Sequence, residues 1–331
     1  MGYVQKLFYP RASCPFPTTL IPSRAKGDWK RLSAMFVALV VPAFLSGCGG
    51  SVSATTPTPT PPSTTGTGGT STSSDPSGSS PTSGSPGTPG TNGTDNTNKT
   101  VISDIQTSSG NWQTWGQPPP YNADCSTSPC NGVSWAMEYG IPSPSQSGNA
   151  TRFTLGGTTP YADALFSAQL IGQNSPQLRD ASHALLPTLN NFTYDVDFYV
   201  TDATITQVLE FDISMYMNGV GMIWGTQCNH LGDKNWDIWD NVHKKWVSAG
   251  VPCSFVNGWN HATMQFSRGT NNALLYQSIE LNGTTYTLNA TYPHGVAPAS
   301  WWGITANYQM DGNSRESENT TYLDNFSVTY W

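Results

Sequence analysis

The sequence predicts that residues 101–331 form an all-β domain, a jelly-roll sandwich of two antiparallel sheets. Two segments, 192–201 and 208–217, alternate apolar and polar residues with a period of two, which is typical of half-buried strands. Further short strand candidates separated by turn signals continue to the C-terminus, and only 177–186 has a helical pattern. Many short strands in a segment of this length favour a sandwich over a helical or α/β fold.

The two alternating segments each have one apolar and one polar face. The apolar face of the first consists of Phe192, Tyr194, Val196, Phe198 and Val200, and that of the second consists of Leu209, Phe211, Ile213, Met215 and Met217. The remaining strand candidates are 220–228, 259–267, 273–281, 284–290, 301–309 and 321–330. Asn282-Gly283 separates two of them and predicts a two-residue hairpin turn.

Charge is distributed unevenly along the chain. Residues 1–48 carry six Lys or Arg and one acid, whereas residues 101–331 carry 18 acids and seven Lys or Arg. Nucleic-acid binding needs a basic surface that neutralises phosphates. We therefore expect no nucleic-acid partner for the acidic domain.

An apolar run at 32–45 follows Lys26, Lys30 and Arg31, which is the pattern of an export signal. The run is too short for a bilayer-spanning helix. It ends in Leu45-Ser46-Gly47-Cys48, which resembles the lipobox of bacterial lipoproteins. That resemblance implies a signal peptide at 1–48 and a lipidated Cys48; the alternative is an ordinary signal peptide with a coincidental cysteine.

Residues 49–100 are predicted to be a disordered linker. Of these 52 residues, 44 are Ser, Thr, Pro or Gly, so the segment has little apolar surface to bury. With the lipid it would tether an exported domain to a bacterial membrane, although plain low-complexity sequence would look the same. Gly49 differs from the Asp of an inner-membrane retention signal, which favours the outer membrane or cell surface.

The domain contains Cys125, Cys130, Cys228 and Cys253, and an even number of cysteines in an exported domain favours disulfides. Three pairings are possible. We favour Cys125–Cys130 and Cys228–Cys253, because each closes a loop within one neighbourhood. A zinc site is the alternative, but the usual short Cys and His spacings are absent.

Several motifs resemble the concanavalin A-like lectin/glucanase superfamily. Val208-Leu209-Glu210-Phe211-Asp212-Ile213 resembles the V-x-E-F-D strand of legume lectins and the start of the E-x-D-x-x-E strand of family sixteen glycoside hydrolases. Gly258-Trp259-Asn260-His261, then Leu275-Tyr276 and Asn282-Gly283, resembles a hairpin of related sandwiches, and 322–328 resembles their closing strand. The resemblance implies a sandwich fold and a carbohydrate ligand.

Two departures from these motifs bear on catalysis. In the hydrolase pattern Glu210 would be the nucleophile and Asp212 the assisting carboxylate, but Ser214 and Met215 occupy the positions expected for the acid/base. In the lectin pattern Glu210 and Asp212 would bind metal, and only Asn218 is a further candidate nearby. Glu210 and Asp212 are thus candidate catalytic residues only if the protein is an enzyme.

Four carboxylates are candidate ligand-binding groups. Asp195 and Asp197 share one strand face, and Glu210 and Asp212 share another. If 201–207 joins these strands as antiparallel neighbours, all four would crowd one surface, where like charges are unfavourable without a cation, protons or basic partners. One interpretation of these four carboxylates is a ligand groove or a metal site. The other is a solvated outer face, on which the acids only supply solubility.

Aromatic residues and turn acids complete the candidate set. Trp224, Trp236, Trp239 and Trp246 lie among Asp and Asn residues, and such groups suit a neutral glycan, although Trp also fills sandwich cores. We expect one or two of the four to contact ligand. Of Trp301 and Trp302, at most one should be in the core. Asp311 and Asp324 are candidate ligands of a structural calcium, although turn chemistry explains Asp311 equally well.

These observations predict a lipid-anchored, exported protein whose domain binds a neutral polysaccharide without catalysis. It would need no cofactor, and its contact with a membrane would be through the lipid alone. One alternative is a glycoside hydrolase or polysaccharide lyase of the same fold that uses Glu210. The other is a structural or adhesion module without a small ligand.

Overall fold

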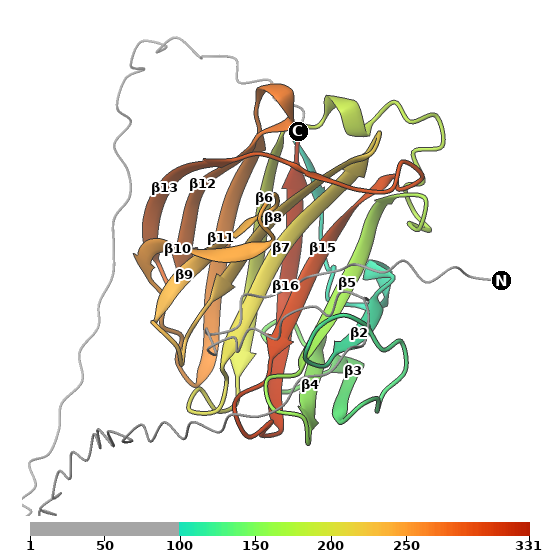
Figure 1. Cartoon of the computed structure of the whole chain (residues 1–331). Coiled ribbons are helices and arrows are strands. Elements are labelled where there is room, and N and C mark those ends of the chain that lie inside the picture. The colour runs from blue at the N-terminus through green and yellow to red at the C-terminus, as the bar shows by residue number, and fades with distance from the viewer. Residues whose placement is uncertain (1–98) are drawn as a thin grey trace, which may run out of the picture. The chain divides into compact units, whose positions relative to one another are not determined.

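The computed structural model describes residues 99–331, which form two antiparallel sheets packed face to face (Figure 1). The predicted signal peptide at 1–48, its Cys48 and the linker up to residue 98 lie outside the described residues. Those assignments therefore remain predictions. The predicted all-β sandwich is confirmed.

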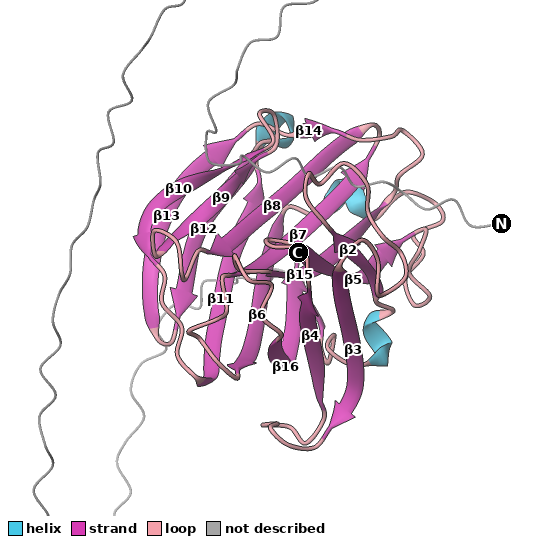
Figure 2. Ribbon diagram, turned by 60° about the horizontal axis from the view of Figure 1, so that its bottom comes forward, coloured by secondary structure: helices cyan, strands magenta, loops and turns pink. Residues whose placement is uncertain are grey.

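Each sheet has eight strands. Sheet A contains, in spatial order, β13 (Thr284–Tyr292), β12 (Leu274–Leu281), β11 (Gly258–Arg268), β6 (Asn191–Val200), β16 (Asn319–Tyr330), β4 (Ala150–Gly157) and β3 (Val133–Ile141), with β1 (Thr100–Ile102) paired to β16. Sheet B contains β10 (Lys245–Pro252), β9 (Asn235–Asp240), β8 (Val220–Cys228), β7 (Val208–Met217), β15 (Gly303–Asp311), β5 (Asp163–Gly172) and β2 (Gln113–Gln117), with β14 (Gly295–Val296) paired to β8. Figure 2 shows the short 3₁₀ turns η1 (Ser108–Gly110), η2 (Leu186–Thr188) and η3 (Thr270–Asn272) outside the sheets.

Every predicted strand is present, with ends shifted by at most two residues. The Asn282-Gly283 turn joins β12 to β13, and both residues have the positive φ (51° and 79°) that this hairpin type requires. The apolar faces of β6 and β7 meet in the core, where the rings of Phe198 and Phe211 lie 5.2 Å apart.

The expectation that the strands at 192–201 and 208–217 pair is wrong. β6 pairs with β11 and β16 in sheet A, whereas β7 pairs with β8 and β15 in sheet B. Residues 201–207 cross from sheet A to sheet B. The apolar faces of β6 and β7 then pack against each other, which buries more apolar surface than pairing the two strands within one sheet. The outward acids of β6 and β7 therefore lie on opposite sides of the sandwich.

The predicted helix at 177–186 is also wrong. Asp180 and His183 have positive φ, which ends any helix there. The Asp180 carboxylate instead accepts hydrogen bonds from the backbone N–H groups of Ala184, Leu185 and Leu186 and from Trp302 Nε1. A local side-chain-to-backbone network thus replaces the helical pattern.

Both favoured disulfides are confirmed. Cys125 pairs with Cys130 and Cys228 with Cys253, with Cα–Cα distances of 6.0 Å and 5.5 Å. Disulfides persist in oxidising compartments, which fits an extracytoplasmic domain. Within residues 99–331, no helix has the length and apolar character needed to cross a bilayer.

Candidate functional site

The outer face of sheet B carries a dense set of polar side chains. β15 turns its apolar residues into the core, so Thr305, Asn307, Gln309 and Asp311 point outward. Strict register places Asn307 opposite Ser167 of β5 and Asp212 of β7. The alternation along each strand thus builds one continuous polar face.

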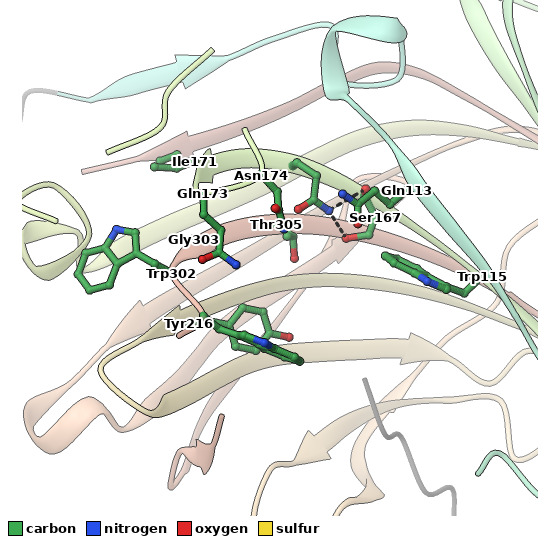
Figure 3. Close-up of a pocket in the computed structure, with 12 residues that line it drawn as sticks. Gln113, Trp115, Ser167, Ile171, Gln173, Asn174, Tyr216, Trp302, Gly303 and Thr305 are labelled. Carbon is green, nitrogen blue, oxygen red and sulfur yellow. Dashed lines mark hydrogen bonds between the residues drawn. The ribbon is translucent and has the colours of Figure 1, made fainter. Parts of the chain in front are cut away.

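A first hollow on this face, which we call the neutral pocket, lies over β2, β5 and β15 (Figure 3). Its lining consists of Gln113, Trp115, Ser167, Gln169, Ile171, Gln173, Asn174, Tyr216, Trp301, Trp302, Gly303 and Thr305. Figure 3 shows Trp115 and Trp302 at opposite ends, with amides and hydroxyls between them. None of these twelve described residues carries a charge. The pocket thus offers aromatic surface and neutral hydrogen-bonding groups together.

A hydrogen-bond chain holds the floor of the neutral pocket. Gln169 Nε2 donates to Ser167 Oγ at 3.1 Å, and Ser167 Oγ donates to Asn307 Oδ1 at 2.7 Å. Asn307 Nδ2 donates to Ser214 Oγ at 3.1 Å. The chain links β5, β15 and β7 and fixes the orientation of each amide, which pre-organises the face for a polar ligand.

A second and larger hollow, the β8–β9 groove, has a volume of about 520 Å³. β9 pairs with β8 only along Thr226–Cys228, so the two strands separate beyond that point. Gly221 and Ile223 form part of the base, and Trp239 and Trp301 line the groove. Lys244 and His294 are the basic residues of its lining.

Tyr216 and Trp301 line both hollows. Their rings pack edge to face with centroids 5.1 Å apart. This aromatic pair forms a shared boundary, so an extended ligand could contact both hollows at once.

Glu210 and Asp212 point outward on β7 in the same face, yet both are buried. The residues directly across from Glu210 are two amides, Gln309 and Gln227. The nearest strand positions therefore do not supply the close second carboxylate that a retaining glycosidase needs. Asp237 lies one strand further, opposite Gln227, and accepts a hydrogen bond from it at 2.6 Å.

Burial raises the pKa of the Asp212 carboxyl to about 8. A hydrogen bond from the Thr226 N–H opposes this shift, and the negative charge of Asp311 adds to it. Across the sheet, Asp212 faces Asn307 and Gly225. A protonated Asp212 could donate a hydrogen bond as well as accept one.

Two of the four candidate tryptophans lie in the core and two on the outer side of sheet B, where Trp239 is still buried (3% exposed). Trp224 and Trp236 are fully buried between the sheets. Trp239 and Trp246 pack together on the outer face with centroids 5.2 Å apart. A Cβ added to Gly225 would lie 2.7 Å from Trp239 and 3.5 Å from Asp212, so this glycine lets the tryptophans approach the acid.

The remaining candidates lie elsewhere. Asp195 and Asp197 are on the outer face of sheet A, and both contact His261. Asp311 belongs to sheet B and Asp324 to sheet A, and a structural calcium at either residue remains a prediction. No group of three His, Cys, Asp or Glu side chains within residues 99–331 is arranged to hold a metal.

Sequence reasoning missed most of the neutral pocket. Trp115, Gln113 and Gln169 come from β2 and β5, which lie outside the motifs that carry the superfamily resemblance. Tyr216 was recognisable only as the last outward residue of the 208–217 alternation. Of Trp301 and Trp302 only Trp302 belongs to the core, as expected, where it stacks on His183; both residues precede β15 and line the neutral pocket.

No family model and no curated protein matches this chain. Similar solved structures include a carbohydrate esterase of the Shiga toxin-encoding bacteriophage phi24B (14% identity, TM-score 0.33, 60% of this chain and 89% of that chain). A legume lectin-like domain from Entamoeba histolytica has 9% identity and a TM-score of 0.32, and covers 60% of this chain and 89% of its own. The carbohydrate binding module CBM66 from Bacillus subtilis has 11% identity and a TM-score of 0.27, and covers 59% and 95%. Such remote likenesses carry no argument about the ligand of this chain.

Proposed function

We propose that the outer face of sheet B binds a neutral polysaccharide without cleaving it. The uncharged lining of the neutral pocket carries this proposal, since four aromatic rings and six neutral polar side chains meet there. Aromatic faces pack on the C–H faces of sugar rings, and fixed amides and hydroxyls bind sugar hydroxyls. The acidic domain, with 18 acids against seven Lys or Arg, would repel an anionic chain.

The neutral pocket encloses only about 40 Å³, whereas the β8–β9 groove is more than ten times larger. The shared Tyr216–Trp301 pair joins the two hollows. We therefore expect a ligand that spans both, such as several consecutive sugars of a chain, rather than a single monosaccharide.

Retardation in native gels containing neutral polysaccharides tests this proposal with the full-length protein in detergent. Trp115→Ala should reduce retardation, weakening binding by about tenfold as for an interface hot spot. Tyr139→Ala, at an exposed position on β3, is the matched control and should bind normally. Absence of retardation by every polysaccharide tested would favour the structural or adhesion module.

Cleavage is the second candidate function, and the raised pKa of Asp212 favours it, because a protonated carboxyl can act as a general acid. Glu210 on the same strand face would be its partner. The amides that flank Glu210 argue against a retaining mechanism. Release of reducing ends or unsaturated sugars that disappears in Glu210→Gln would establish a hydrolase or lyase.

We further propose that the protein is exported and anchored by lipid at Cys48. The basic flank, apolar run and lipobox-like ending support this proposal, and the two disulfides agree with it. Cys48→Ser should release the protein from the membrane fraction. Unchanged fractionation of that variant would contradict lipid anchoring.

A further inference from the structure

Three aromatic side chains line up across adjacent strands on the outer face of sheet A. Trp259 of β11 and Tyr322 of β16 are both in register with Tyr199 of β6. The Tyr199 ring lies 5.4 Å from that of Trp259 and 5.8 Å from that of Tyr322, edge to face in both cases. All three are half-buried. We call them the sheet A aromatic row.

The row continues in register across two more strands. Arg152 of β4 lies opposite Tyr322, and Glu138 of β3 lies opposite Arg152. The five positions span about 19 Å at the usual inter-strand spacing of about 4.8 Å. The row is thus an extended strip on the side of the sandwich opposite the neutral pocket.

The ionisable groups beside the row are paired within the protein. Arg152 forms an ion pair with Glu138. His261 Nδ1 lies 2.8 Å from Asp197, and its Nε2 lies 3.5 Å from Asp195. Asn325 Nδ2 donates to the other oxygen of Asp197 at 2.8 Å. Because these charges already have partners, the strip suits an uncharged ligand better than an ionic one.

We propose that the sheet A aromatic row is a second carbohydrate-binding surface, which takes a neutral polysaccharide chain. The aromatic rings would pack against sugar faces, and the polar groups of His261, Asp197 and Asn325 would bind hydroxyls along one edge. Cross-strand aromatic contacts also stabilise a sheet, so the test must separate ligand binding from stability. With the outer face of sheet B, the row would make the domain bivalent.

A protection experiment on the unmodified full-length protein tests the row without any risk of misfolding. N-bromosuccinimide oxidises accessible tryptophans, and peptide mass spectrometry reports each one separately. A neutral polysaccharide that retards the protein should reduce the oxidation of Trp259 by about fivefold or more. Equal oxidation of Trp259 with and without the polysaccharide would overturn the proposal.

Variants separate the two faces. Trp115→Ala removes the sheet B contact and should leave residual binding. The double variant Trp115→Ala, Trp259→Ala should abolish that residual binding. Trp259→Ala alone should retain binding but lose the ability to cross-link a soluble polysaccharide, which light scattering measures. Its circular dichroism spectrum should be unchanged. Total loss of binding in Trp115→Ala, or cross-linking unchanged in Trp259→Ala, would contradict a second surface while leaving the sheet B proposal intact.

Self-association is the competing use of such a row. Analytical ultracentrifugation without polysaccharide distinguishes it, because a second copy on the row would give a concentration-dependent dimer that Trp259→Ala abolishes. That result would overturn the carbohydrate assignment of the row. A monomer at all concentrations would support it.

Discussion

Phe198 of β6 and Phe211 of β7 meet ring to ring, with centroids 5.2 Å apart, between the two sheets. Successive side chains of a strand point to opposite faces of its sheet. Asp197, next to Phe198, and Asp212, next to Phe211, therefore point away from this contact on opposite sides of the sandwich. The contact therefore both fills the core and divides the outward acids between two independent surfaces.

We expect Phe211→Ala to destabilise the domain by about 3–5 kcal/mol, the usual cost of emptying a large aromatic site in a core. The Phe211 ring is fully buried and also contacts Tyr308 and Trp236. Urea unfolding measures the change. Val296→Ala, at an 89% exposed position, is the control and should stay within about 0.5 kcal/mol of the parent. A loss below about 1 kcal/mol in Phe211→Ala would contradict the packing described here.

His261 should make stability depend on alkaline pH. Hydrogen bonds to Asp195 and Asp197 raise the pKa of His261 to about 10, from an ordinary value near 6.5. Between these values the folded state binds more protons than the unfolded state, so this stabilisation is complete below about pH 6.5 and is lost as the pH rises towards about 10. The melting temperature of the parent should fall across this window relative to that of His261→Gln. Parallel curves for the two proteins would show that the ion cluster does not stabilise the fold.

Gly225→Ala should disturb Trp239 and Trp246 on the outer side of sheet B. The new Cβ would lie 2.7 Å from the Trp239 Cβ, which must shift, and 3.2 Å from the Trp246 ring, which must give way slightly. Such overpacking costs about 1–3 kcal/mol. Gly221→Ala is the matched control, since its nearest contact would be 3.3 Å. Tryptophan fluorescence and thermal unfolding should change more at Gly225 than at Gly221, and equal effects would contradict the close approach.

Asp324→Asn should loosen the 142–149 loop. The Asp324 carboxylate accepts hydrogen bonds from the hydroxyls of Ser145 and Ser147 at 2.6 Å each, and from the backbone N–H groups of Gln146 and Ser147. Losing charge-assisted bonds of this kind costs about 1.5–3 kcal/mol. We expect faster hydrogen exchange at residues 145–148 of the variant than of the parent. Unchanged exchange there would show that Asp324 does not hold the loop.

The same carboxylate should contribute to acid sensitivity. Burial raises the pKa of Asp324, but its hydrogen bonds outweigh burial and lower the pKa below the ordinary 3.8. The stabilisation is therefore present above about pH 3.8 and lost as the pH falls through the lowered pKa. Asp324→Asn should lack this part of the acid dependence in a thermal unfolding series.

The sequence alone predicted eight of the sixteen strands, and in β6 and β7 the period-two alternation records which residues face the core. It did not predict β1 to β5, β9, β10 or β14. It predicted the Asn282-Gly283 hairpin, the two disulfides within local loops, and that at most one of Trp301 and Trp302 lies in the core. Each of these features depends on residues that are near one another in the chain. The helix at 177–186 failed even at short range, because Asp180 bonds the backbone that a helix would have used.

Only the tertiary structure decided which strands are neighbours. Alternation says which residues share a face, but it does not say which sheet a strand joins, and 201–207 can form either a hairpin or a crossover. The crossover sends Asp195 and Asp197 to sheet A and leaves Glu210 and Asp212 beside Asn307 and Gln309. It also places Tyr216 in the same pocket as Trp115, which lies about 100 residues away in the chain. Sheet pairing joins residues that are distant in sequence, so no local pattern could reveal these contacts.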